Sequence, residues 1–314
     1  MINLGATVTS PAKPEVSVII VTYGARELTM SCLESVASEI APLSAEVIIV
    51  DNGSPTALVN EITSAYPAFQ VIPLTENSGF ASAANLAADT AKGRYLLLLN
   101  PDTLVLPGAI RRMLAFARRR SQAGIWGGQT LFAGGEINPT SCRRGLSLWQ
   151  LFCTAFALDT RFPNSDLFAA VGYGGWRRDN ERSVDVVCGS FMLVHRDLWD
   201  RLGGFSPPFF MYSEDEELCL RARRLGFNPV FSPEPAIIHS GSGTECNRDR
   251  KIRHLLASRA LLIRAYYSPL AKPFALLLLM LRPRLGSWFA TPPLRSMWRN
   301  VWAQHHSWLR GQFR

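Results

Sequence analysis

The sequence lacks the features that define several protein classes. Its six cysteines stand at irregular spacings with no C-x-x-C pair, which in a chain of 314 residues argues against a disulfide framework and against a zinc site. No basic stretch followed by an apolar stretch opens the chain, so we expect no secretory signal and a cytoplasmic location. The longest apolar run, Phe274–Leu281, is much shorter than the ~20 residues of a membrane-spanning helix. We expect this run to lie on a membrane rather than to cross one.

Acidic residues are scarce at the end of the chain. The whole chain has a formal net charge of +8, but the stretch from Arg248 to Arg314 alone holds thirteen Lys or Arg residues and one acid, Asp249. Anionic lipid headgroups and nucleic acid attract such a tail by the same long-range forces, so charge alone leaves both partners open. We expect residues 246–314 to form basic amphipathic helices that bind an anionic membrane surface, at the inner face of the cell membrane. The simple alternative is that these helices pack on the preceding domain.

The chain does contain a regular alternation of strand and helix patterns. Its hydrophobic content of 47% is sufficient for a sizeable buried core. The β-branched run Val16–Val21 is typical of a strand that is buried on both faces. Further strands are predicted over 46–50, 69–73 and 95–99, and helices over 25–37, 56–65 and 81–91. This alternation predicts an α/β fold with a Rossmann-like, mostly parallel sheet flanked by helices, over residues 14–245, after a disordered segment 1–13.

Beyond residue 106 the pattern is looser. We expect a basic helix over 111–120, a hairpin over 126–136, a strand over 185–195, a helix over 214–225 and a strand over 235–238. In parallel sheets, ligands bind beyond the carboxyl ends of the strands. Four residues that follow predicted strands should therefore meet at one edge of the sheet, namely Thr22, Tyr23, Asp51 and Asp102.

Several of these residues suit a nucleotide. The carboxylate of Asp51 can accept the imide N–H of uracil or thymine while the ring of Tyr23 covers the base. A strand-end aspartate also often caps a turn, and this alternative stays open. Asp102 ends the segment Asn100–Asp102 after a buried strand, where one carboxylate can hold a divalent cation against a diphosphate. The alternative for this segment is a simple Asn-Pro turn.

Three further segments carry polar residues at element ends. Asn77 to Phe80, followed by Asn85, opens a predicted helix, whose free amides can bind a diphosphate or can simply be capped. Glu214 to Glu217 open another helix, where acids complement the helix dipole. One such carboxylate could instead take the proton of an attacking hydroxyl, and we favour this interpretation. His239 follows a predicted strand, and a lone histidine is more often a packed residue than a metal ligand.

Seven segments, in this order, resemble family 2 glycosyltransferases of the GT-A fold, in their rhamnosyltransferase-like branch: VSVIIVTYG, VIIVDNGS, ENSGFASAAN, LLLLNPDT, VVCGSFMLVHRDLWDRLGGF, FFMYSEDEELCLRARRLGF and IIHSGSG. The resemblance covers about residues 14–245. It implies a nucleotide-sugar site formed by Thr22, Tyr23, Asp51, Asn77, Gly79, Phe80, Asn85 and Asn100.

The same resemblance implies the catalytic and metal-binding roles. Asp215 of the ED pair would be the catalytic base, and Glu214 would position it or the acceptor. Asp102, which ends the family's DxD-type motif, would bind Mg²⁺ or Mn²⁺ with His239 nearby, and Asn100 stands where that motif has its first acid. The sequence departs from the family in having Gly24 where an asparagine is usual, and in lacking an aspartate after its GGF segment. Neither departure touches the implied base or the metal ligand.

We therefore expect an inverting glycosyltransferase, a hexosyltransferase of cell-surface polysaccharide biosynthesis. The resemblance implies that it moves a sugar, with dTDP-L-rhamnose as the expected donor, to a hydroxyl of a lipid-linked saccharide. Nucleic acid is not an expected partner. The alternative is a non-catalytic protein that binds membranes or nucleic acid through its basic tail, although such binding does not need Asp102, Glu214 or Asp215. A dehydrogenase is excluded because the glycine fingerprint of a dinucleotide site is missing.

Overall fold

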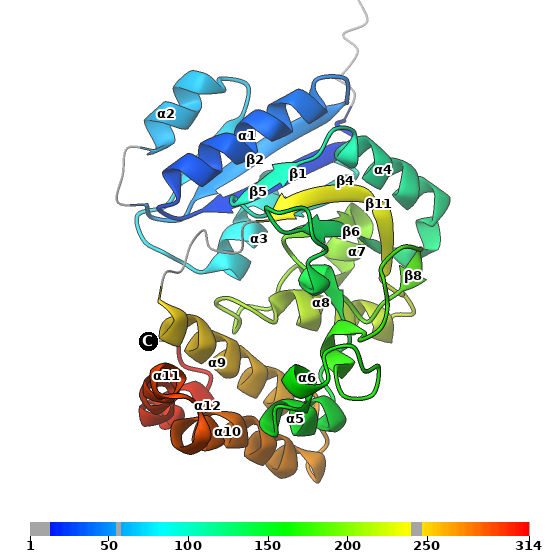
Figure 1. Ribbon diagram of the computed structural model, residues 1–314. Coiled ribbons are helices and arrows are strands. Elements are labelled where there is room, and N and C mark those ends of the chain that lie inside the picture. The colour runs from blue at the N-terminus through cyan, green and yellow to red at the C-terminus, as the bar shows by residue number, and fades with distance from the viewer. Residues whose placement is uncertain (1–12, 55–57, 240–246, 314) are drawn as a thin grey trace, which may run out of the picture.

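A mixed sheet forms the centre of the computed structural model, which describes residues 13–54, 58–239 and 247–313 (Figure 1). The order of its strands is β3-β2-β1-β4-β10-β6-β11-β5, and β8 pairs with β11 beside this path. The first four strands in the chain are parallel neighbours: β1 (Val16–Thr22), β2 (Ala45–Asp51), β3 (Gln70–Pro73) and β4 (Tyr95–Leu99). The α/β class and this parallel half are as the sequence predicts.

The second half of the sheet is mixed. β10 (Phe191–His195) runs antiparallel between β4 and β6 (Ile125–Leu131). β11 (Val230–His239) is parallel to β6 and antiparallel to β5 (Thr103–Val105) and to β8 (Arg182–Ser183). The parallel order therefore ends at β4, and the carboxyl ends of β4 and β11 still meet near the same edge.

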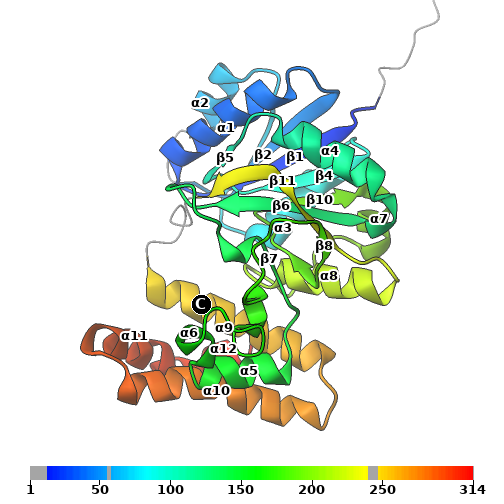
Figure 2. The ribbon, with the colours of Figure 1, turned by 45° about the vertical axis from the view of Figure 1, so that its right-hand side comes forward.

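Helices cover both faces of the sheet. In β1, the side chains of Val18 and Ile20 face one layer and those of Ile19 and Val21 face the other, because successive residues of a strand point to opposite faces. The first layer holds α1 (Arg26–Ile40), α2 (Leu58–Ala65) and α4 (Ala109–Arg119). The second layer holds α3 (Phe80–Thr90), α7 (Arg196–Leu202) and α8 (Glu214–Arg224) (Figure 2).

Two of the predicted elements are wrong in detail. The region 126–136 is not a hairpin, because β6 is an inner strand and only the bridge between Leu131 and Ile137 closes a turn after it. The region 185–195 is divided into β9 (Val186–Val187), which pairs with β7 (Cys142–Arg143), and β10. The break between them, at residues 188–190, directs the backbone amide of Gly189 toward Asp215 at the start of α8.

The remaining helices form a second body below the sheet in both ribbon views (Figures 1 and 2). They are α5 (Leu148–Ala155), α6 (Leu158–Arg161), α9 (Arg248–Tyr266), α10 (Ala271–Phe289), α11 (Pro292–Ala303) and α12 (His305–Leu309). Short 3₁₀ helices span Ser121–Ala123, Pro139–Ser141 and Ala170–Gly172. Across the described ranges, no helix is long and apolar enough to cross a membrane.

The first tail helix, α9, packs on the sheet domain as well as within the second body. Leu262 of α9 is buried among residues of α8, and the Ser258 hydroxyl donates a hydrogen bond of 2.7 Å to the carbonyl of Met211. The hydroxyl of Tyr266 donates to the carboxylate of Glu217. The alternative of tail helices that pack on the domain therefore applies to α9. The expected boundary near residue 245, and the expected disorder of residues 1–13 apart from Lys13, lie outside the described residues.

Leu262→Ala should destabilise the whole sheet domain. Deleting a buried leucine side chain costs about 2–5 kcal/mol, because transfer energy is lost and a cavity is left. Urea unfolding should show that loss in the free energy of unfolding, while Leu225→Ala, at a side chain that is 44% exposed, should change it by less than about 0.5 kcal/mol. Equal, small effects of both substitutions would contradict the burial of α9 in this core.

Candidate active site

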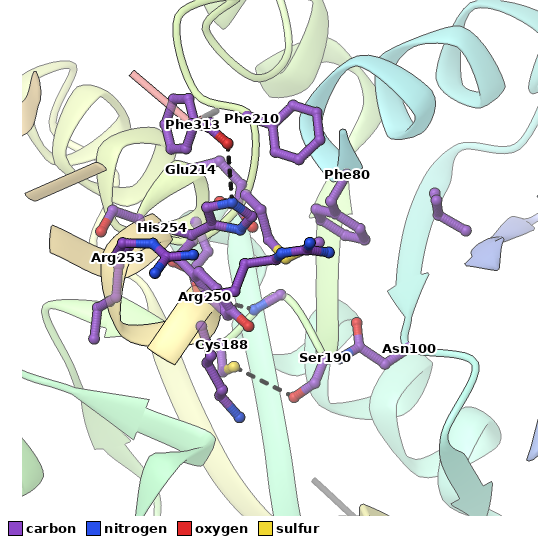
Figure 3. A pocket seen from close by; sticks show the side chains of 18 of the residues that line it. Phe80, Asn100, Cys188, Ser190, Phe210, Glu214, Arg250, Arg253, His254 and Phe313 are labelled. Carbon is purple, nitrogen blue, oxygen red and sulfur yellow. Dashed lines mark hydrogen bonds between the residues drawn. The ribbon is translucent and has the colours of Figure 1, made fainter. Parts of the chain in front are cut away.

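A cavity of about 970 Å³ lies between the sheet edge and the start of α9. Its walls come from the ends of β1, β4 and β11, from the turn between β9 and β10, from the start of α8 and from α9 and α12. Figure 3 shows Arg250, Arg253 and His254 of α9 projecting into this space together with Glu214. Thr22, Tyr23, Asn77, Phe80 and Asn100 of the predicted nucleotide-sugar site line the cavity, as do Asp102, His239, Glu214 and Asp215.

Asp51 does not line the cavity. Its carboxylate accepts hydrogen bonds from the backbone and the hydroxyl of Ser54, and the Ser54 hydroxyl in turn accepts one from the backbone of Gly24 (2.9 Å). This is the turn-capping arrangement that the sequence left open. It ties the loop after β1 to the loop after β2, so Tyr23 stands at the cavity edge and is 41% exposed.

The neighbouring residue Asn52 does line the cavity and organises the loop before α3. Its side-chain oxygen accepts hydrogen bonds from the backbone and hydroxyl of Ser78 at 2.9 and 3.0 Å, and its amide donates to Asn77 at 3.1 Å. Gly79 has a positive φ of 84°, and a Cβ there would come within 2.4 Å of the carbonyl oxygen of Phe210. A glycine is therefore required for close packing of this loop on the segment before α8.

Gly79 and Asn85 lie outside the cavity lining. The side chain of Asn85 bonds to both backbone groups of Phe205, donating to the carbonyl at 2.8 Å and accepting from the N–H at 2.9 Å. It thus fixes α3 to the loop that leads to α8. Gly79 and Asn85 therefore hold together the segments that form the cavity wall without lining the cavity themselves.

Asp102 and His239 meet although 137 positions separate them in the chain. The Nε2 atom of His239 lies 3.0 Å from Oδ1 of Asp102, and the side-chain amide of Asn100 lies 3.4 Å from the same nitrogen. β5, which follows Asp102, pairs with β11, so His239 at the end of β11 stands opposite Thr103. In the described part of the chain, no three His, Cys, Asp or Glu side chains gather as a complete metal site.

Asp215 is held by a full set of donors. Arg143 binds both of its oxygens, with Nη2 2.7 Å from Oδ1 and Nη1 3.2 Å from Oδ2. The backbone of Glu216 donates to Oδ1 at 2.7 Å and that of Gly189 to Oδ2 at 3.1 Å. Burial acts to raise the pKa of Asp215, but the charge and hydrogen bonds of Arg143 bring it below its ordinary value. Asp215 is therefore ionised at neutral pH.

The pKa of Glu214, the residue before Asp215, is shifted in the opposite direction. Its side chain lines the cavity, and its Oε2 atom is buried without a hydrogen-bond partner among the described residues. Burial, followed by the charge of Asp215, raises the pKa of Glu214 to about 8. Two adjacent carboxyl groups are thus held in different protonation states near neutral pH, an arrangement typical of acid–base sites.

The other two acids of this helix are structural. Glu216 accepts a hydrogen bond from the backbone of Leu146 at 2.6 Å, and Glu217 pairs with Arg221 at 2.7 Å. Just before them, Tyr212 and Ser213 both adopt positive φ angles, 67° and 61°. Such backbone conformations cost about 1–3 kcal/mol each in residues other than glycine and cluster at functional sites.

Sequence reasoning missed the basic side of the cavity. Arg143 comes from the two-residue strand β7, and no local pattern marks it as the partner of Asp215, 72 positions away. Arg250, Lys251, Arg253 and Arg259 of α9 also line the cavity, and the sequence shows them only as part of a generally basic tail. Arg259 makes no hydrogen bond or salt bridge with any residue that the structure describes.

The sheet and the cavity at its edge have the arrangement of a glycosyltransferase of the GT-A fold class. A strand-edge cavity holds a carboxylate and a histidine in contact, and an ionised carboxylate at a helix start lines the same cavity. The family model of glycosyl transferase family 2 matches residues 17–200. The chain belongs to this family and is a glycosyltransferase, so the alternative of a non-catalytic binding protein is wrong.

Relatives point to the rhamnosyltransferase-like branch. The chain is 30% identical over 205 residues to an N-acetylglucosaminyl-diphospho-decaprenol L-rhamnosyltransferase of Mycobacterium tuberculosis, a match that covers 62% of this chain and 66% of the relative. It is 25% identical over 236 residues to the rhamnosyltransferase WbbL of Escherichia coli K12, covering 71% of this chain and 83% of the relative.

Solved structures share the fold. A mannosyltransferase from Pyrobaculum calidifontis in complex with GDP-Man and Mn²⁺ matches with a TM-score of 0.54 at 18% identity, over 96% of this chain and 86% of that one. GalNAc-T7 with UDP, GalNAc and Mn²⁺ matches with a TM-score of 0.61 at 15% identity, over 94% and 56%. At these identities the likeness concerns the fold alone.

Glu214→Gln should make stability less dependent on pH. Because the folded protein keeps the Glu214 proton up to a pKa of about 8 while the unfolded chain releases it near 4.5, the free energy of unfolding falls as pH rises through that window. Glutamine has no proton to hold, so urea unfolding should show the variant gaining stability relative to the wild type between pH 5 and pH 8. Glu27→Gln on the exposed face of α1 is the control. A difference that stays constant with pH would contradict the raised pKa.

Proposed function

We propose that this glycosyltransferase moves L-rhamnose from dTDP-L-rhamnose, with inversion, to a hydroxyl of a saccharide linked to a polyprenyl diphosphate, in cell-surface polysaccharide biosynthesis. The observation that carries the proposal is the single cavity that Asp102, His239 and Asp215 line together. The similarity to the mycobacterial relative, whose name states a decaprenol-diphosphate acceptor and L-rhamnose transfer, supports the substrates.

Asp102 and His239 are the proposed metal ligands. Their facing atoms are 3.0 Å apart, which is about the separation of adjacent ligands around an octahedral ion with bonds of about 2.1 Å. Bound Mg²⁺ or Mn²⁺ would act there as a Lewis acid on the leaving diphosphate. Asn100 stands beside His239, where its amide orients the imidazole.

Asp215 is the proposed catalytic base. Only an ionised carboxylate can accept the proton of the acceptor hydroxyl, and Arg143 keeps Asp215 in that form. A carboxylate has about four acceptor positions, and four N–H groups occupy those of Asp215. An acceptor hydroxyl that binds Oδ2 therefore replaces one of its two longer bonds, from Arg143 at 3.2 Å or Gly189 at 3.1 Å.

Glu214 has a different proposed role. At neutral pH it keeps its proton, so it cannot be the base and can instead donate a hydrogen bond to a hydroxyl of the acceptor or the sugar. Its unpartnered Oε2 atom is available for the same ligand. The adjacent pair would thus orient the acceptor through Glu214 and take its proton through Asp215.

Arg259 suits the diphosphate of the acceptor. The charges of Glu216 and Arg143, the residues around Asp215, act on Arg259, which lies nine residues, or about 13 Å of helix rise, beyond Arg250. Burial lowers the pKa of its guanidinium, so a bound anion is favourable there. An acceptor hydroxyl at Asp215 would leave the acceptor's charged group within reach of this side of the cavity.

Asp215→Asn should lower kcat by about 10²–10⁴, because asparagine cannot accept the proton, while the KM for the donor changes little. Initial rates with dTDP-L-rhamnose and a diphosphate-linked acceptor measure this. Asp197→Asn, at a carboxylate that is exposed on α7, is the matched control. Wild-type kcat in purified, folded Asp215→Asn protein would remove Asp215 from the base role.

Arg259→Gln should raise the KM for the acceptor by about 10- to 100-fold, since a hydrogen bond to a charged group contributes about 1.5–3 kcal/mol. The KM for the donor should stay unchanged, and an uncharged acceptor analogue should be used equally well by both proteins. Arg111→Gln on exposed α4 is the control. A raised KM for the donor instead would assign Arg259 to the donor diphosphate.

A further inference from the structure

Helix α10 has an apolar surface on both of its sides. Toward the protein it packs through residues that include Ala275, Leu279 and Gly286. On the opposite side, Phe274, Leu277 and Trp288 are 65%, 54% and 51% exposed, and Leu270, at the N-cap of the helix, is 84% exposed. Their spacings of four, three and eleven residues bring them to one stripe of a helix with 3.6 residues per turn. Large apolar side chains on the outer side of a helix need an explanation that the protein core does not provide.

Aromatic side chains are also exposed on the neighbouring helices α5 and α6. Trp149, Phe152 and Phe156 of α5 are 42%, 38% and 49% exposed, and Trp149 stacks on Phe152 with ring centroids 5.5 Å apart. Phe162, just after α6, is 43% exposed. α5 shares the hydrophobic cluster of α10, and both helices lie at the end of the molecule that is farthest from the sheet in Figures 1 and 2.

The charges of the tail beyond the start of α9 have one sign. After Asp249 the sequence contains no acidic residue, whereas it contains ten Lys or Arg residues from Arg253 onward. Arg284 lies on the ring of Trp288 at 4.0 Å, so a cation accompanies the apolar stripe itself. Exposed tryptophan and phenylalanine combined with Lys and Arg are typical of helices that lie in the interface of an anionic membrane.

We propose that the outer stripe of α10, together with the exposed aromatic residues of α5 and α6, docks flat on a bilayer that contains anionic lipids. This docking face consists of Leu270, Phe274, Leu277, Trp288, Phe289, Trp149, Phe152, Phe156 and Phe162. The inference deepens the proposed function, since it supplies the surface on which a lipid-linked acceptor would be met. It also differs from the expectation of the sequence, because α5 and α6 precede the basic tail by almost a hundred residues.

The docking face and the cavity share one helical body. Ser307, Trp308 and Phe313, at the end of the chain, line the cavity, and Trp308 is buried in the cluster that holds Ala275 and Leu279 of α10. The helix that would bind the membrane and the residues that line this side of the cavity therefore belong to the same packed cluster. A polyprenyl chain can remain in the bilayer while its saccharide enters the cavity.

Vesicle binding by the full-length protein tests the proposal. We compare the wild type with Phe274→Ser/Leu277→Ser and with Trp149→Ser/Phe152→Ser, on vesicles of phosphatidylcholine alone or with added phosphatidylglycerol. Each pair should weaken binding to the anionic vesicles by at least about tenfold, because apolar area is no longer buried in the bilayer. Leu225→Ser and Leu104→Ser, at side chains that are 44% and 42% exposed elsewhere, should bind as the wild type does.

Two results would overturn the proposal. One is wild-type vesicle affinity in both double variants while circular dichroism shows them folded. The other is a dimer in vesicle-free solution that both double variants convert to monomer, which would make the face a contact with a second copy. Transfer to a short-chain, water-soluble acceptor separates this inference from the proposed function. The variants should retain that transfer, whereas its absence in the wild type would count against the proposed function alone.

Discussion

Buried carboxylates at the start of α8 are the constraint on which the site depends. Four consecutive acids are withdrawn from water there, and each ionised one requires compensation. Arg143 compensates Asp215, Arg221 compensates Glu217, and the backbone of Leu146 binds Glu216. The hydroxyl of Tyr266 in α9 also binds Glu217. These contacts bring β7, the segment before α5 and the end of α9 together at the start of α8, although they are far apart in the chain.

The same burial gives Glu214 and Asp215, the two carboxyl groups that face the cavity, different protonation states. Arg143 can neutralise one carboxylate fully but not two, so the second one lowers its free energy by keeping its proton. A charged carboxylate and a protonated one therefore stand next to each other. The left-handed backbone at Tyr212 and Ser213 maintains the turn that presents them.

Much of this architecture could be predicted because it follows local patterns. Strand ends indicated Thr22, Tyr23 and Asp102 as residues of one edge, since parallel strands carry their carboxyl ends to the same side, and all three line the cavity. The resemblance to the family, and not the strand pattern, indicated His239, which lines it as well. For Asp51 the structure shows the turn cap, while its neighbour Asn52 lines the cavity; nothing in the sequence tells which of two adjacent polar residues caps the turn. Arg143 and Arg259 could not be found, because their roles arise from contacts between distant segments. The outward face of α10 could not be predicted either, because a run of leucines has no polar side that distinguishes the exposed face from the buried one.

A crystal structure of the protein with dTDP and Mn²⁺ tests the central claim, that donor and acceptor chemistry meet in one cavity. The account predicts the ion between Oδ1 of Asp102 and Nε2 of His239, the diphosphate beside it and Asp215 facing the same space. A nucleotide bound outside this cavity, or an ion held by other residues, would contradict the account.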